Sequence, residues 1–126
     1  TLLESRKLAP GIDTVCLTIE TPSDDTVRRG DAKPSPWLGG LDLAAYGGSV
    51  PRLAKAAGCA AWSPLWRNVS PAEVDDAHKL GLRVIPWTVN DPADMAKLID
   101  MNVDGLITDY PDRARKVMAA KGVPLP

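Results

Sequence analysis

The sequence lacks the features that mark several classes of protein. No apolar run is long enough to span a membrane, and no signal peptide precedes the first helix-like stretch, 2–8. The 15 basic and 16 acidic side chains leave a formal net charge of −1, which gives no general attraction to nucleic acid or to an anionic membrane. The sequence therefore predicts neither a membrane span nor a nucleic-acid partner. Because the chain begins without methionine inside a predicted element, we expect a fragment or a processed product.

Residue types that bind metals or act as nucleophiles are also scarce. The two cysteines, Cys16 and Cys59, lie in predicted apolar strands, and neither has another cysteine or a histidine at ligand spacing. Two buried free thiols are the favoured interpretation, with a disulfide as the alternative. The single histidine, His78, lies within a predicted helix, which favours a surface or packing role over catalysis. The acidic pairs at 24–25 and 75–76 are adjacent in sequence, and neither forms a metal site by itself.

Helices and strands alternate along the rest of the chain. Proline, glycine and capping residues mark the ends of the elements; for example, Ser70 and Glu73 have the spacing of a capping box, and Asp91 precedes Pro92 at a helix start. Asn102 is placed to end that helix in the left-handed conformation. The patterns predict helices over 2–8, 49–57, 70–80, 91–101 and 112–121, and strands over 14–19, 58–63, 83–89 and 105–109.

This alternation implies parallel strands joined by right-handed crossovers. The strands are apolar along most of their length, as strands buried on both faces are. A lone four-stranded sheet with helices on one face would expose its other face. The pattern therefore favours closure with strands that are missing from the chain, or the dimerisation of two halves. Pro86 argues against a regular strand over 83–89, because proline has no N–H to donate to the hydrogen bonds between strands.

Residues 20–48 interrupt the alternation. This stretch is dense in proline, glycine, aspartate and serine, with short apolar patches at 37–38 and 41–46. Since it follows a strand, it would lie at the C-terminal face of a barrel, where we favour a substrate-side lid or rim over a mobile tether. We therefore treat residues 1–126 as a single partial domain with a long loop insert at 20–48.

Two blocks of sequence resemble motifs of the glycerophosphodiester phosphodiesterase family. Residues 84–90 read V-I-P-W-T-V-N, and residues 103–112 read V-D-G-L-I-T-D-Y-P-D. Both occur in order around one helix, and the linking stretch 95–101 also fits, so the resemblance is specific over 82–121. It implies an α/β fold, namely the C-terminal half of a TIM (β/α)₈ barrel with about four parallel strands and alternating helices.

The resemblance also implies a chemistry. Proteins of this family hydrolyse glycerophosphodiesters to an alcohol and glycerol 3-phosphate with a divalent cation, Ca²⁺ or Mg²⁺. Their catalytic histidines and metal carboxylates lie in the first half of the barrel, in an early H-R-G, a P-E-N-T, an E-x-D strand and a later H-D, none of which is found here. We expect this chain to supply pocket wall only, with no catalytic residue or metal ligand, and to be inactive alone.

The missing parts must come from elsewhere. The expected partners are the small glycerophosphodiester and either the missing N-terminal half-barrel or a second copy of the chain. The alternative is a non-catalytic half-barrel that acts as a scaffold or dimerisation module. Similar proteins are often exported in bacteria, so the resemblance favours the periplasm over the cytoplasm.

Candidate site residues follow from the rule that barrel active sites gather at the C-terminal ends of the strands. The resemblance places Trp87 in the pocket wall, against the glycerol or alcohol moiety, and an amphipathic ring at a strand end suits that role; packing in the barrel core is the alternative. Trp62 and Trp66 flank the neighbouring strand end, one lining the site while the other packs against a helix. Glu20 is a carboxylate at a strand end within reach of the site. Asn90 either caps the next helix, which is favoured, or fixes the loop.

Overall fold

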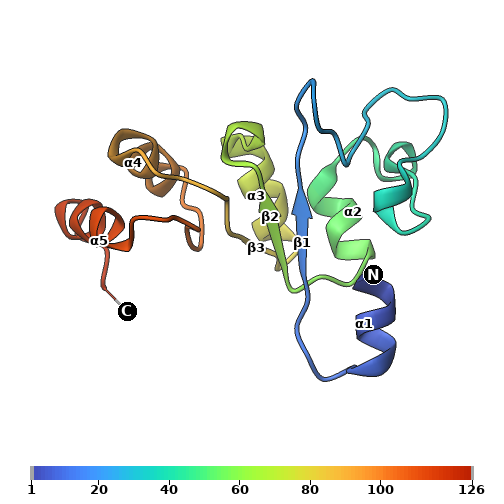
Figure 1. Cartoon of the computed structure of the whole chain (residues 1–126), viewed down its shortest axis with the longest axis horizontal. Helices are drawn as coiled ribbons and strands as arrows, with labels where there is room; N and C mark the ends of the chain where they lie inside the picture. Colours follow the sequence, from blue (N-terminus) through green and yellow to red (C-terminus); the bar gives the residue numbers. More distant parts are fainter. Residues whose placement is uncertain (1, 126) are drawn as a thin grey trace.

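The computed structural model describes residues 2–125 as a small parallel sheet with helices (Figure 1). The strand order is β1-β2-β3, and both pairings are parallel, with Val15 opposite Ala61 and Trp62 opposite Val84. Within the described residues, no helix is long and apolar enough to cross a membrane. The elements are α1 (Leu2–Leu8), β1 (Val15–Thr18), η1 (Pro36–Leu38), η2 (Leu43–Tyr46), α2 (Val50–Ala56), β2 (Ala61–Pro64), η3 (Trp66–Asn68), α3 (Pro71–Lys79), β3 (Arg83–Val84), α4 (Pro92–Asp100) and α5 (Pro111–Ala120).

The predicted helices are confirmed, and so are the residues expected to begin and end them. At α3, the Ser70 hydroxyl accepts the Glu73 N–H at 3.4 Å, while the Glu73 carboxylate accepts the Ser70 N–H at 3.1 Å, which completes the capping box. The Asp91 carboxylate accepts the Ala93 N–H at 2.8 Å at the start of α4. Asn102 follows that helix with φ of 63°, in the left-handed region.

The strand predictions need correction at the C-terminal end of the sheet. The strand expected over 83–89 spans only Arg83–Val84, and 105–109 is not a strand. Hydrogen bonds still follow the parallel pattern: the Ile107 N–H donates to the Pro86 carbonyl at 2.9 Å, and the Val89 N–H donates to the Ile107 carbonyl at 2.8 Å. Because Pro86 has no N–H to donate, the ladder toward 105–109 loses one bond and the regular strand ends early.

The two predicted free thiols are in fact a disulfide between Cys16 and Cys59. Cys16 lies opposite Trp62 in the β1–β2 register, and Cys59 precedes β2 by two residues. This register brings the two Cα atoms to 5.9 Å, within the ordinary range for a disulfide. Spacing along the chain gives no sign of the pair, since 43 residues separate the two cysteines.

The core lies between the sheet and the helices that follow β1 and β2. Trp62, Val74 and Val84 are at most 1% exposed and belong to one apolar cluster with residues of α2 and the insert. A second cluster joins α4 and α5 through Met95, Leu98 and Ala114. By contrast, β1 pairs on one side only, and Leu17 on this strand is 60% exposed.

The insert at 20–48 is packed against the body of the protein. It leaves the C-terminal end of β1 and returns beside α2 (Figure 1). Val27 is 1% exposed, and Leu38 and Leu43 are each 8% exposed, all within the same cluster as Leu53 of α2. These contacts hold the insert against α2 in this structure, and its place on the substrate side stays a prediction.

A polar contact between the start of α2 and the body of α3 ties the two helices together. The Ser49 hydroxyl donates to the Asp76 carboxylate at 2.7 Å, and the Arg52 guanidinium lies 3.3 Å from its other oxygen. The hydrogen bond from Ser49, helped by Arg52 and Lys79, lowers the pKa of Asp76 below its usual value of 3.8, against a smaller opposing effect of burial.

This lowered pKa predicts a pH-dependent stability. The folded state favours the charged carboxylate more than the unfolded chain does, so the stabilisation is present above pH 3.8 and is lost as the pH falls through the lowered pKa. Asp76→Asn should lower the free energy of unfolding by about 1 kcal/mol at neutral pH, since the pair is partly exposed. Urea unfolding should show this gap shrinking as the pH falls below 3.8. The exposed neighbour serves as the control: a gap of equal size in Asp75→Asn would contradict the assignment.

Candidate functional site

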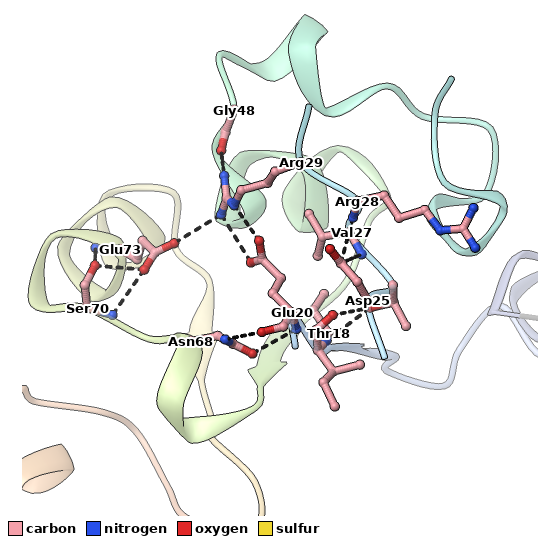
Figure 2. A network of polar contacts seen from close by, with 12 residues as sticks. Thr18, Glu20, Asp25, Val27, Arg28, Arg29, Gly48, Asn68, Ser70 and Glu73 are labelled. Atoms are coloured by element: carbon pink, nitrogen blue, oxygen red, sulfur yellow. Dashed lines mark hydrogen bonds and ion pairs between the residues drawn. The ribbon is translucent and has the colours of Figure 1, made fainter. Parts of the chain in front are cut away.

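Glu20, at the C-terminal end of β1, is held by an arginine of the insert (Figure 2). Arg29 Nε lies 2.5 Å from Glu20 Oε2, and Nη2 lies 3.3 Å from Oε1, so the contact uses both carboxylate oxygens. Arg29 also approaches Glu73 at 3.5 Å and donates to the Gly48 carbonyl. One guanidinium therefore connects the end of β1, the first turn of α3 and the end of the insert.

The backbone of Glu20 is fixed as firmly as its side chain. Its N–H donates to Asn68 Oδ1 at 2.9 Å, and its carbonyl accepts from Asn68 Nδ2 at 2.8 Å. Asn68 belongs to η3, directly after β2, so this amide joins the ends of two neighbouring strands. Glu20 thus lies at the predicted edge of the sheet, where its carboxylate is engaged with Arg29 and anchors the insert.

Trp62 lies in the core and not on a site wall. Its side chain is only 1% exposed, and its indole N–H donates to the Thr18 hydroxyl at 2.8 Å. Thr18 is itself 7% exposed, so this hydrogen bond is buried between β1 and β2. A ring with neither free surface nor a free donor cannot contact a substrate in this arrangement, which corrects its place among the candidates.

Trp66 packs against a helix, as one of the two tryptophans was expected to do. Its ring lies against the cluster of Val89, Met95 and Leu98, under α4. The guanidinium of Arg67 covers the ring at 4.4 Å from its centre. Trp66 is partly exposed beside α4, and its place in a pocket wall stays a prediction.

Trp87 is half-buried just beyond β3, at the C-terminal side of the sheet. Its indole N–H donates to the Ser63 carbonyl at 2.8 Å, and its backbone carbonyl accepts from the Trp66 N–H at 2.9 Å. The ring is therefore oriented by β2, with its donor already used. What it can offer a ligand is the apolar surface of the ring.

Asn90 fixes a loop, contrary to the favoured expectation that it caps a helix. Its side-chain oxygen accepts from the Asp109 N–H at 3.0 Å and from the Thr108 hydroxyl at 3.2 Å, while its Nδ2 donates to the Asp109 carboxylate at 2.8 Å. Arg113 of α5 donates to its backbone carbonyl at 3.1 Å. The N-cap of α4 is the next residue, Asp91.

His78 has the packing role expected of it. Its Nε2 lies 2.9 Å from the Asp104 carboxylate, which also accepts the Val84 N–H at 2.7 Å. This pair ties α3 and β3 to the turn before residues 105–109. Within residues 2–125, no group of three or more histidine, cysteine, aspartate or glutamate side chains is placed to hold a metal ion.

Sequence reasoning missed the two residues that organise the end of β1. Arg29 meets Glu20 across nine residues of the insert, and Asn68 meets it across 48 residues. Neither spacing follows the period of a helix or a strand. The parallel β1–β2 pairing brings Asn68 to Glu20, whereas Arg29 reaches Glu20 because the insert folds back on itself.

Comparison with known proteins agrees with this arrangement. The family model for the glycerophosphoryl diester phosphodiesterase family matches residues 6–113, which is most of the chain. The chain belongs to this family. A glycerophosphodiester phosphodiesterase of Bacillus subtilis is 51% identical over 54 residues, which make up 43% of this chain and 18% of that protein.

Solved structures place the phosphodiesterase-family chain in a larger fold. A Silicibacter pomeroyi protein, provisionally assigned as a glycerophosphoryl diester phosphodiesterase, superposes with a TM-score of 0.76 at 32% identity over 97% of this chain and 35% of its own. A phosphodiesterase of Oleispira antarctica, solved with sn-glycerol-3-phosphate, gives a TM-score of 0.63 at 19% identity over 94% of this chain and 38% of its own. The chain thus spans little more than a third of these proteins, and its parallel sheet with helices is part of a TIM barrel.

The buried contact of Trp62 yields a prediction. Thr18→Val removes the acceptor and leaves the indole N–H of Trp62 buried without a partner, which should lower the free energy of unfolding by about 1–3 kcal/mol. Urea unfolding followed by circular dichroism measures this loss. Thr14→Val makes the same chemical change just outside β1 and is the control. Equal stability of the two variants would show that the hydrogen bond contributes little.

The Arg29 contacts yield a second prediction. Arg29→Gln should weaken the anchoring of the insert by about 1 kcal/mol, because the contacts are charged but partly exposed, and should speed proteolysis within 21–48 about fivefold. The matched control is Arg28→Gln, since the Arg28 guanidinium points away from this cluster (Figure 2). Cleavage that rises equally in both variants would contradict the role given to Arg29.

Proposed function

We propose that this chain is the C-terminal part of the catalytic barrel of a phosphodiesterase that hydrolyses glycerophosphodiesters to an alcohol and glycerol 3-phosphate. The observation that carries this proposal is the family match over residues 6–113. The glycerol 3-phosphate bound to the Oleispira antarctica enzyme supports the identity of the product.

In this proposal the chain supplies part of the pocket wall. Trp87 is the residue that best fits that role, because the Ser63 carbonyl fixes the ring and leaves an apolar surface at the C-terminal side of the sheet. Asn90 supports the wall by fixing the 108–109 turn next to it. Glu20, Trp62 and Trp66 act indirectly, by holding the strand ends and the insert.

A divalent cation, Ca²⁺ or Mg²⁺, is the cofactor proposed for the complete barrel. The described residues do not fit such an ion, since they include no cluster of three potential ligands. The carboxylates at the strand ends are committed elsewhere, as Glu20 is to Arg29 and Asp109 is to Asn90. Metal-assisted cleavage with acid and base histidines would therefore depend on residues outside this chain.

The role of Trp87 predicts a specific kinetic effect in a longer protein that contains this chain and a complete barrel. Trp87→Ala should raise KM for a glycerophosphodiester about 10- to 100-fold, corresponding to the loss of about 1.5–3 kcal/mol of apolar contact, with a smaller change in kcat. Release of glycerol 3-phosphate measures both constants. Trp87→Phe retains an apolar ring and is the matched control. An unchanged KM in Trp87→Ala would remove this residue from the pocket wall.

The isolated 126-residue chain should release no glycerol 3-phosphate from glycerophosphocholine when Ca²⁺ or Mg²⁺ is supplied. The physical reason is the lack of clustered ligands and of a histidine at a strand end. Measurable turnover by the pure chain would contradict this part of the proposal.

A second candidate function is a scaffold or dimerisation module. The observation that favours it is the exposed apolar surface of β1, where Val15 is 40% exposed and Leu17 is 60% exposed beside an edge with no partner strand. Sedimentation of the purified chain distinguishes the two candidates. A stable homodimer supports the module, whereas a monodisperse monomer counts against it.

A further inference from the structure

We propose that the Cys16–Cys59 disulfide is a redox-sensitive latch that holds the edge strand β1 and the insert at 20–48 to the rest of the protein. The proposal concerns the stability of this part of the fold and is independent of the activity proposed above. It rests on where the bond lies, on what the bond encloses and on which other contacts hold the same segment.

The bond joins the edge strand β1 to the segment that leads into its neighbour, β2. β1 has four residues and pairs only with β2, so its other edge has no partner among the described strands. Cys16 is the second residue of β1, and Cys59 lies two residues before β2. The disulfide therefore holds β1 close to β2 covalently, in addition to the hydrogen bonds of the short β1–β2 ladder.

The bond also closes a loop that contains the entire insert and α2. Between the two cysteines lie residues 17–58, which include η1, η2 and the Glu20–Arg29 ion pair. Opening the bond would remove the covalent link between the two ends of this segment, which would then be held by the β1–β2 pairing, by its buried side chains and by the contacts of Ser49 and Arg29. A long closed loop is the case in which a cross-link most reduces the conformational freedom of the unfolded chain.

The remaining anchors of the insert are few and partly exposed. Outside the loop, Arg29 reaches Glu73 at 3.5 Å, and the backbone of Glu20 reaches the Asn68 amide at 2.8–2.9 Å. The Arg29 side chain is 42% exposed, so its ion pairs are weakened by water. The apolar contribution comes mainly from Val27, together with the residues of η1 and η2 that reach the core.

Reduction is chemically accessible from one side of the bond. Cys59 is 4% exposed, whereas Cys16, on the edge strand β1, is only partly buried and packs against the core cluster. A dithiol reductant would attack one sulfur as a thiolate, form a mixed disulfide and then close its own disulfide. The protein bond breaks and takes up two electrons and two protons as two thiols, while the dithiol is oxidised. The latch is thus closed in an oxidising compartment and open in a reducing one.

The test compares the purified chain with and without dithiothreitol by amide hydrogen exchange, with the thiols counted by alkylation and mass. We expect no alkylated cysteine before reduction and two after it. Exchange in β1 and residues 21–48 should then accelerate at least about tenfold, while α4 and α5, which lie outside the loop, change far less. The Cys16→Ala/Cys59→Ala double variant should show the fast pattern with or without dithiothreitol.

Three outcomes would overturn the proposal. The first is two alkylated cysteines in the unreduced protein. The second is exchange in 21–48 that does not respond to reduction even though both thiols have formed. The third is equal acceleration in α4 and α5, which would indicate a global loss of stability. The reduced wild-type chain alone gives both the thiol count and the exchange rates. The proposal can therefore be tested even if the double variant does not fold.

Discussion

The parallel pairing of β1 with β2 is the constraint on which the rest of the structure depends. Parallel strands bring their carboxyl ends to one edge of the sheet, so Glu20 after β1 meets Asn68 after β2. The same pairing places Thr18 against the indole of Trp62 and brings Cys16 close to Cys59. These contacts connect residues more than 40 positions apart, and all of them follow from a four-residue register.

The insert depends on this edge in turn. Its first residue, Glu20, is fixed by Asn68, and Arg29 folds back to join that residue to the end of the insert at Gly48. The charged cluster is partly exposed and would be a weak anchor alone. Its effect comes from acting together with Val27 and other buried side chains of the insert, which add apolar contact with α2. A long irregular loop thereby becomes a fixed part of the fold.

Local signals predicted the helices well because helix ends are determined by nearby residues. Ser70, Glu73 and Asp91 act within three positions of the helices they cap, so their spacing is visible in the sequence. The family resemblance over 82–121 likewise gave the correct family and fold. These inferences required no knowledge of which strands become neighbours in space.

The predictions that were wrong concern contacts that local sequence signals do not determine. The disulfide and the contact of Glu20 with Asn68 depend on strand pairing, which the sequence alone does not reveal. The role of Asn90 was misjudged because Asp91, the next residue, caps the helix and leaves the amide free to hold the 108–109 turn. In the sequence, Pro86 already argues against a regular strand over 83–89. The structure agrees, since Pro86 has no N–H to donate and the regular strand β3 ends at Val84.

The pocket wall proposed above would have a definite physical character. The Ser63 carbonyl orients Trp87, and Asn90 braces the adjacent turn, so both are positioned by hydrogen bonds within the chain. Such a surface can be in place before any ligand arrives, which reduces the ordering cost of binding. Yet binding that is equal in the ground state and the transition state does not accelerate a reaction. Glu20 is paired with Arg29, and Asp109 accepts a hydrogen bond from Asn90, so in the function proposed above this part would hold the substrate while the groups that act on the phosphodiester would come from the other strands.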